Sequence, residues 1–274
     1  MDLGLSGRVA VVSGSSRGIG LATALALGAE GCRVVVVARS ADGVAQAAER
    51  VRATGAEVHP VVADMTVEAD VGRVVRSATE RFGRVDIAIS NVIGHVIDAA
   101  VEGAGPAAGR FAGMPATEYG AEFSQLAVSA WLLARETVPL MRRARWGRLV
   151  NVGSGVAREP KTDIPHVLPN TVRPVVAGLM RTLAARLAPD GVTCNSVLTG
   201  GIATERNTAY FTWLAAERDL PVAEVLAGFT ADVPVRRMGE PAEIASLITF
   251  LCSARAGRVT GQSIPVDGGV NRHL

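Results

Sequence analysis

Three glycines at fixed intervals form the part of this sequence best suited to hold a charged ligand. Gly14, Gly18 and Gly20 lie between a short apolar run of strand type, Val9–Val12, and an Ala/Leu-rich helical run, Leu21–Leu27. A strand that turns tightly into a helix presents the unpaired N–H groups of the helix start, which bind a pyrophosphate. Glycine permits the turn and the close approach of a phosphate. The sequence therefore predicts a dinucleotide site here, with a glycine-rich turn that holds no ligand as the alternative.

Two arginines favour the phosphorylated form of the dinucleotide. An acidic residue about 20 positions beyond the glycines would bind the ribose 2′-hydroxyl and repel a 2′-phosphate. That place holds Ala38, followed by Arg39, and Arg17 lies inside the glycine turn. Guanidinium groups bind phosphate in a bidentate manner. Each arginine alone is equally explained as a solvated surface charge, but together, with no acid opposite them, they predict NADP(H) rather than NAD(H).

The elements that must position this turn alternate between strand and helix. Apolar runs such as Arg33–Ala38 fit parallel strands that are buried on both faces. The expected strands are Val9–Val12, Arg33–Ala38, Glu57–Ala63, Val85–Ile89, Arg148–Val152, Val192–Leu198 and Gln262–Val266, and the expected helices are Leu21–Leu27, Asp42–Thr54, Val67–Phe82, Glu118–Arg145, Thr171–Leu187 and Pro241–Ser253. This order predicts one α/β domain over residues 1–274, a three-layer, doubly wound parallel sheet of the Rossmann type.

Two segments depart from the alternation. Residues 91–117 are rich in Gly, Ala and Pro and form a loop longer than such connections usually need. Residues 204–232 are expected to be helical, with Tyr210, Phe211 and Trp213 close together. The first segment is either a loose insertion or a wall of the substrate pocket. The second is either a small core or a lid over the substrate, before the C-terminal helix.

Composition excludes several classes of protein. The chain has 274 residues, 49% of them hydrophobic, and a net charge of +2 without a basic stripe, so neither nucleic acid nor a membrane surface is an expected partner. No apolar run approaches the roughly 18 residues of a membrane span, and the N-terminus shows no signal-peptide core. Cys32, Cys194 and Cys252 lack the spacing of metal ligands. We therefore expect a cytoplasmic protein with buried thiols and no metal.

Several segments, taken in order, resemble the short-chain dehydrogenase/reductase family from Gly7 to Gly269. The resemblance is carried by SGSSRGIG at Ser13–Gly20, VVADMT at Val61–Thr66, RVDIAISN at Arg84–Asn91, WGRLVNVGS at Trp146–Ser154, LAPDGVTCNSV at Leu187–Val197, PVRRMGEPAEIA at Pro234–Ala245 and TGQSIPVDGG at Thr260–Gly269. A shared fold does not by itself settle the chemistry.

The resemblance implies further cofactor contacts. Ser16 and Ile19 would belong to the cofactor turn together with the glycines. Asp64 and Met65 would lie against the adenine, Asn91 near the nicotinamide ribose and Thr204 near the carboxamide. The plainer explanations are a helix-capping Asp, a core Met and polar loop residues.

The catalytic centre departs from the family's pattern. In the family a Ser and a Tyr bind the substrate oxygen, a Lys lowers the pKa of the Tyr, and an Asn holds a water of the proton relay. Ser154 matches the Ser, but the Tyr-x-x-x-Lys window falls on Pro169-Asn170-Thr171-Val172-Arg173, and the Asn falls on Leu126. An arginine cannot shuttle protons as a lysine can, although it can hold a ribose or polarise an oxygen.

Four residues remain as candidate catalytic groups: Ser154, Arg173, Asn170 and His166. A histidine, with an ordinary pKa near 6.5, is a natural substitute acid, while a surface histidine in a Pro-flanked loop is the alternative for His166. Ser154 is alternatively a cap for the loop after strand five.

Three functions are consistent with these residues. The first is an NADP(H)-dependent reductase with a rearranged proton donor, acting on a carbonyl or enone of a hydrophobic, polyketide-like substrate. The second is a non-redox cyclase, dehydratase or isomerase in which the cofactor is vestigial. The third is a catalytically silent partner subunit. In each case the apolar helices Glu118–Arg145 and Thr171–Leu187 predict a homodimer or homotetramer.

Overall fold

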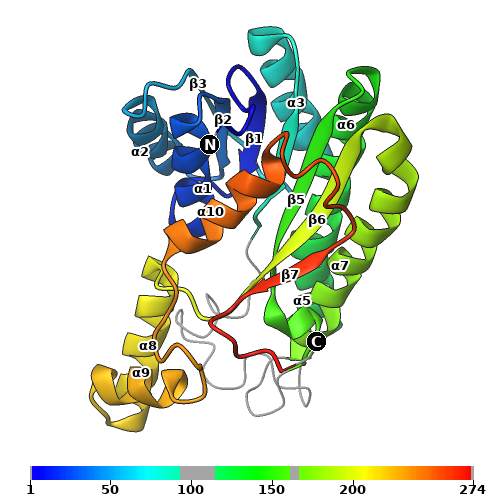
Figure 1. The fold of residues 1–274 in the computed structure, drawn as a ribbon. Coiled ribbons are helices and arrows are strands. Elements are labelled where there is room, and N and C mark those ends of the chain that lie inside the picture. The colour runs from blue at the N-terminus through cyan, green and yellow to red at the C-terminus, as the bar shows by residue number, and fades with distance from the viewer. Residues whose placement is uncertain (1, 93–114, 161–166, 273–274) are drawn as a thin grey trace.

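A seven-stranded parallel sheet forms the centre of the computed structural model, which describes residues 2–92, 115–160 and 167–272 (Figure 1). The strands are β1 (Val9–Ser13), β2 (Arg33–Ala38), β3 (Val58–Val62), β4 (Ile87–Ser90), β5 (Gly147–Ser154), β6 (Val192–Thr199) and β7 (Ser263–Val266). Their order across the sheet is β3-β2-β1-β4-β5-β6-β7. The order reverses between β1 and β4, and ligands of doubly wound sheets bind at that switch point.

Helices cover both faces of the sheet. They are α1 (Gly18–Ala29), α2 (Ala41–Arg52), α3 (Glu68–Phe82), α5 (Ala116–Phe123), α6 (Ser129–Arg143), α7 (Val167–Leu187), α8 (Glu205–Arg218), α9 (Val222–Thr230) and α10 (Pro241–Cys252). One core packs α3, α6 and α7 on the sheet, and the other packs α1, α2 and α10. Alternate residues of β1 enter opposite cores, Val9 and Val11 one of them, Ala10 and Val12 the other. The predicted Rossmann-like domain is confirmed.

The prediction of one continuous helix over Glu118–Arg145 is wrong. The helical region begins earlier, as α5, and a single π-helical segment, η3 (Ser124–Val128), separates α5 from α6. A π segment carries an additional residue in its turn, so it rotates the side chains that follow, and such segments are frequent at functional sites. No propensity in the sequence marks it.

Helix α7 also differs from its expected start at Thr171. Its described part begins at Val167, so Pro169 and Asn170 lie in its first turn, where a proline is tolerated because the N–H groups there have no partner within the helix. Residues 204–232 form two helices, α8 and α9, whose own small core is Phe211, Ala215 and Val225. Figure 1 shows this pair set apart from the layers that flank the sheet.

Most of the long loop predicted at 91–117, and the candidate His166, lie outside the described residues. Within the described ranges, no helix has both the length and the apolar character that a membrane crossing requires. Over the same ranges, no three His, Cys, Asp or Glu side chains come together as a metal site would need. The three cysteines are all buried and unbridged, and burial raises the pKa of each thiol.

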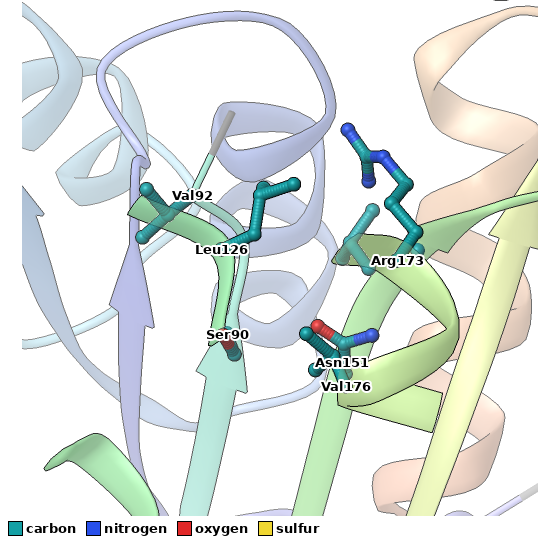
Figure 2. Close-up of a pocket in the computed structure, with 8 residues that line it drawn as sticks. Ser90, Val92, Leu126, Asn151, Arg173 and Val176 are labelled. Carbon is teal, nitrogen blue, oxygen red and sulfur yellow. The ribbon is translucent and has the colours of Figure 1, made fainter. Parts of the chain in front are cut away.

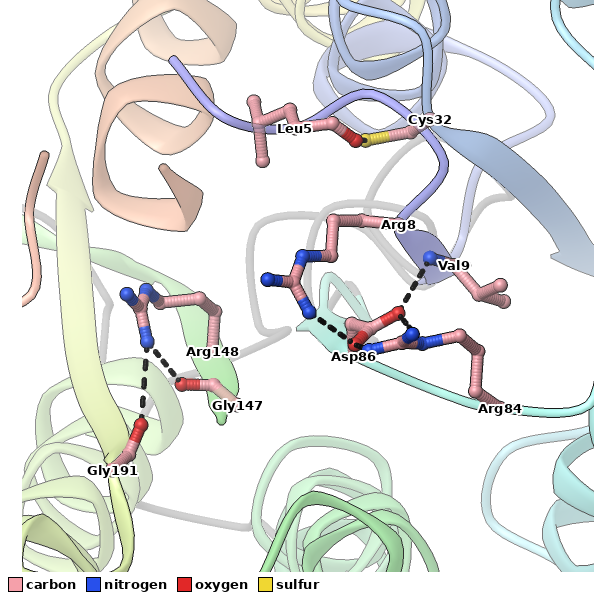
Figure 3. Close-up of polar contacts among 9 residues, drawn as sticks. All are labelled: Leu5, Arg8, Val9, Cys32, Arg84, Asp86, Gly147, Arg148 and Gly191. Carbon is pink, nitrogen blue, oxygen red and sulfur yellow. Dashed lines mark hydrogen bonds and ion pairs between the residues drawn. The ribbon is translucent and has the colours of Figure 1, made fainter. Parts of the chain in front are cut away.

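A buried carboxylate organises the amino-terminal edge of the sheet, opposite the glycine turn. Asp86, just before β4, accepts hydrogen bonds from Val9 N at 2.9 Å, Arg8 Nη1 at 3.1 Å and Arg84 Nε at 2.8 Å (Figure 3). Its side chain is 1% exposed. The carboxylate therefore ties the start of β1 to the start of β4.

The indole of Trp146 extends this network to β5. Arg8 and Arg148 each place a guanidinium carbon near the ring centroid, at 3.9 and 4.2 Å. Arg148 is almost fully buried, and its Nε donates to the carbonyl of Ser253 at the end of α10, at 3.1 Å. Burial lowers the pKa of Arg148. The cation–π contacts and hydrogen bonds compensate part of this desolvation.

We expect the substitution Asp86→Ala to lower the free energy of unfolding by about 3 kcal/mol, because it leaves buried N–H groups and two arginines without their acceptor. Glu57→Ala is the control, since Glu57 pairs with Arg33 on the surface, where an ion pair contributes less than about 1 kcal/mol. Urea unfolding measures both. Equal losses for the two variants would contradict a structural role for the Asp86 network.

Candidate functional site

The turn after β1 can be built only with glycine. Gly14 and Gly18 have φ of +60° and +56°. A Cβ on Gly14 would lie 2.1 Å from the carbonyl oxygen of Asn91, and a Cβ on Gly20 would lie 2.2 Å from the carbonyl oxygen of Gly14. Helix α1 starts at Gly18, and no side chain caps its first N–H groups. These donors are therefore placed as an anionic ligand requires.

Serine hydroxyls and one amide brace the turn from behind. Ser13 Oγ donates to the carbonyl of Ile89 and accepts from Asn91 N, both at 2.9 Å. The Nδ2 of Asn91 donates to the carbonyl of Gly14 at 3.1 Å. Ser15, buried between β1 and β2, accepts from Val37 N at 2.9 Å. The amide of Asn91 thus fixes the turn, and its predicted contact with a ribose stays a prediction.

The two predicted phosphate-binding arginines are exposed beside this turn. Arg17 is the residue before α1, and Arg39 follows β2. Neither forms a salt bridge with any residue in the described part of the chain. Ser16, the residue before Arg17, lies against the first turn of α2, where its Cβ is 3.2 Å from the position of a Cβ on Gly43. Both cations are therefore accessible to a ligand.

The other predicted cofactor residues are partly occupied by the protein itself. Asp64 Oδ1 accepts from Thr66 N at 2.9 Å and from its hydroxyl at 2.7 Å. Met65 is buried in the α3–α6–α7 core, and Ile19 packs against the other core. Thr204 caps α8 by accepting from Asn207 N at 3.3 Å. Its Cγ2 would touch a Cβ on Gly18 at 3.3 Å, so Thr204 lies against the glycine turn.

A small cavity of about 10 Å³ lies at the carboxyl ends of β4 and β5, which is enough for about one water. Its lining residues are Ser90, Val92, Leu126, Asn151, Val152, Gly153, Arg173 and Val176. Figure 2 shows Leu126 and Arg173 projecting toward the same space from different helical segments, with Ser90 and Asn151 below them in that view. The structure therefore brings together η3, the end of β5 and α7.

Ser154 is the last residue of β5 and directly follows the cavity residue Gly153. It is half-buried, as are Pro169 and Asn170 in the first turns of α7. The loop after Ser154 packs against the C-terminal tail, because a Cβ on Gly155 would lie 2.6 Å from Asn271 Nδ2. Arg272 N also donates to Glu159 Oε2 at 3.1 Å. This packing holds the backbone around Ser154.

Arg173, on α7, is half-buried. Burial lowers the pKa of its guanidinium, the charge of Glu122 opposes this, and Arg206 on α8 adds to it. Glu122, on α5, is 1% exposed. The sequence analysis missed Glu122. An acid on the apolar face of a predicted helix, four residues before Leu126, was the available signal.

A second, open groove of about 810 Å³ runs along α8 and begins beside the glycine turn. It is lined by Ala203, Thr204, Glu205, Thr208, Ala209, Thr212, Trp213 and Ala216. Small and apolar side chains predominate, and Thr204 joins the groove to Gly18. The groove could therefore receive an apolar molecule that reaches toward a ligand at the turn.

The sequence model of the family described as enoyl-(acyl carrier protein) reductase matches residues 14–271. The chain belongs to the short-chain dehydrogenase/reductase family. The short-chain reductase protein NovJ of Streptomyces niveus is 31% identical over 261 residues, which cover 95% of this chain and 93% of NovJ.

Solved structures of other members of the short-chain dehydrogenase/reductase family have the same fold as this chain. L-sorbose reductase of Gluconobacter frateurii, complexed with NADPH and L-sorbose, has a TM-score of 0.90 and 29% identity, with 100% of both chains covered. A variant of actinorhodin polyketide ketoreductase with NADPH has a TM-score of 0.87 and 25% identity, with 97% of this chain and 98% of that chain covered. The relatives compared are thus reductases.

Proposed function

We propose that this protein is an NADP(H)-dependent reductase that acts on a carbonyl or enone of a hydrophobic, polyketide-like compound. The glycine turn with two exposed arginines is the observation that carries the proposal. The N–H groups at the start of α1 would hold the pyrophosphate, and Arg17 and Arg39 would hold the 2′-phosphate. NADPH, the ligand in the L-sorbose reductase structure, supplies a hydride when it is bound.

The catalytic residues proposed here differ from those of the family. Ser154 would donate a hydrogen bond to the substrate oxygen, and Arg173 would stabilise the negative charge that develops on that oxygen, or hold the ribose. Pro169 and Leu126, at the family's Tyr and Asn positions, carry no donor. The proton would come from water, from the substrate or from another side chain, with Asn170 and His166 as the remaining candidates. An acid contributes typically 10²–10⁴-fold, so hydride transfer without the family's Tyr is feasible.

The substrate class follows from the groove along α8 and from the relatives. The groove presents Ala, Thr and Trp side chains rather than charged ones, apart from Glu205. Actinorhodin polyketide ketoreductase supports a polyketide-like substrate. We infer that α8 and α9 act as a lid on this substrate.

A non-redox activity on the same scaffold is the second candidate, namely a cyclase, dehydratase or isomerase. The observation in its favour is the apolar character of Leu126 and Pro169 at two positions where the family places proton-handling groups. A catalytically silent partner subunit would show the same two residues. These alternatives differ from the reductase in whether hydride leaves the cofactor.

We expect the protein to bind NADPH more tightly than NADH. Arg39→Asp should weaken NADPH binding by about tenfold to a hundredfold, because it replaces a charge-assisted phosphate contact by repulsion. Arg50→Asp is the control, since Arg50 is exposed in the last turn of α2, far along the helix from Arg39. Titration calorimetry measures the affinities. Equal affinities of the wild type for both nucleotides would refute the assignment.

We also propose a homo-oligomer, formed through the outer face of α6 and α7. Trp131 on α6 is 51% exposed and Val175 on α7 is 43% exposed, and both helices cover the same face of the sheet. Trp131→Glu should convert a dimer or tetramer into smaller species. Val235→Glu, at an equally exposed apolar residue before α10, should not. Light scattering at micromolar concentration measures the mass of each variant in solution. A monomeric wild type would contradict the proposal.

The chemistry itself is tested by following deuteride from labelled NADPH into the product. If the protein is a reductase, the product carries deuterium. Ser154→Ala should then lower turnover by about 10²–10³-fold and leave NADPH affinity nearly unchanged, because it removes a hydrogen-bond donor from the charged transition state. Ser246→Ala, on the exposed face of α10, is the control. Turnover without nucleotide, giving an unlabelled product, would instead establish the non-redox activity.

A further inference from the structure

The loop after β3 is held by a carboxylate from the helix that follows it. Asp70, in the first turn of α3, accepts a hydrogen bond from Asp64 N through Oδ2 at 2.8 Å. Its Oδ1 accepts from Arg73 Nη2 at 2.7 Å, and the same nitrogen donates to the carbonyl of Val62, the last residue of β3, at 3.0 Å. The carboxylate and the guanidinium therefore join the end of the strand, the loop and the helix.

This contact differs from an ordinary helix cap. An acid at the third position of a helix commonly accepts from the N–H of its own N-cap residue. Glu243 does so in α10, where its Oε2 accepts from Glu240 N at 2.7 Å. The N-cap residue of α3 is Val67, whose N–H donates to the carbonyl of Asp64 at 3.0 Å, and Asp70 reaches past it to Asp64 N. Asp70 therefore fixes the loop rather than the N-cap of its own helix.

The loop leaves one carboxylate oxygen of Asp64 for a ligand. Asp64 Oδ1 accepts from both the N–H and the hydroxyl of Thr66, at 2.9 and 2.7 Å. Among the residues that the structure describes, none forms a hydrogen bond or an ion pair with Asp64 Oδ2. The side chain is half-buried. A carboxylate oxygen in this state can accept a hydrogen bond from an amino group.

The strand order places this oxygen where the base of the dinucleotide would lie. β1, β2 and β3 are neighbouring parallel strands, so their carboxyl ends share one edge of the sheet. The pyrophosphate is proposed to lie after β1, and Arg39, proposed for the 2′-phosphate of the adenosine ribose, follows β2. The next strand is β3, about 5 Å further along the sheet. The adenine joined to that ribose would therefore reach the loop at Asp64.

We propose that Asp70 is a positioning residue of the cofactor site, which holds the loop after β3 so that Asp64 offers Oδ2 to the amino group of the adenine. Asp70 acts through Asp64 and does not touch the nucleotide. The hydrogen bonds from Asp64 N and from Arg73 lower the pKa of Asp70, so it is ionised at neutral pH. An acceptor that is fixed before binding loses less conformational freedom when the ligand arrives. The role rests on the proposed binding of NADPH at the glycine turn, whereas the hydrogen bonds of the loop do not.

The first experiment compares NADPH with its deamino analogue, in which hypoxanthine replaces adenine and the amino group is absent. By titration calorimetry, the wild type should bind NADPH at least tenfold more tightly than the analogue. Asp70→Ala should weaken NADPH binding about tenfold, because the amino group loses a charge-assisted hydrogen bond. The same substitution should weaken binding of the analogue less than twofold.

Two further variants control this comparison. Asp70→Asn keeps an acceptor for Asp64 N and should recover most of the NADPH affinity. Glu68→Ala removes another acid from the first turn of α3, one that pairs with Arg135 and not with the loop. It should change the affinity for either nucleotide less than twofold, because it alters the charge at the helix start and leaves the loop as it is.

Two results would overturn the positioning role. If Asp70→Ala weakens both nucleotides by the same factor, Asp70 supports the site as a whole and not the contact with the amino group. If the wild type binds both nucleotides equally, Asp64 does not contact the adenine, although NADPH binding itself would stand. A wild type that binds neither nucleotide would refute the proposed function together with this role.

The second experiment measures hydrogen exchange in the loop without any nucleotide. Asp70→Ala should speed the exchange of the Asp64 amide at least tenfold, because that N–H loses its acceptor, and Glu68→Ala should leave it unchanged. Unchanged exchange in Asp70→Ala would show that another group holds the loop, and the proposal would be wrong. If Asp70→Ala does not fold, Arg73→Ala takes its place, since the Arg73 side chain is 48% exposed. It should weaken NADPH binding about fivefold and binding of the analogue less than twofold, and equal losses would contradict the proposal.

Discussion

The close approach of β1 and β4 at their carboxyl ends is the constraint on which the candidate site depends. Gly14 and Asn91 are in backbone contact there, and Gly20 brings α1 against the same point. The strand order reverses between β1 and β4, and ligands of doubly wound sheets bind at this switch point. The absence of three side chains at Gly14, Gly18 and Gly20 therefore creates both the turn and the access to it.

Local patterns predicted the sheet well, because a parallel strand buried on both faces must be apolar at nearly every position. The run Arg33–Ala38 illustrates this, since its predicted and observed bounds agree. The glycine turn was equally predictable, because a Cβ on Gly14 or Gly20 would overlap a carbonyl oxygen. The helices were predicted less well, because neither the π segment at Ser124–Val128 nor the start of α7 at Val167 leaves a mark in the local periodicity of the sequence.

The family resemblance predicted where several residues of the candidate site lie, but it did not predict which other side chains are buried near them. Leu126 and Arg173, which the family resemblance placed at the site, line one cavity at the ends of β4 and β5, and Ser154 directly follows its lining residue Gly153. The resemblance did not predict that Glu122 is almost fully buried, because only the packing of the helices removes that acid from water. In the sequence, Glu122 is visible only as a charge on an apolar helix face.

The two ends of the sheet use buried charge differently. At the amino end, Asp86 is surrounded by donors from Arg8, Val9 and Arg84, and its interactions are internal to the fold. At the carboxyl end, the half-buried Arg173 is the one charged residue among those that line the small cavity. A network whose hydrogen bonds are all made within the protein contributes stability and leaves no group for a ligand. Asp86 is therefore suited to joining strands, whereas Arg173 carries its charge to the edge of a cavity at the opposite end of the sheet.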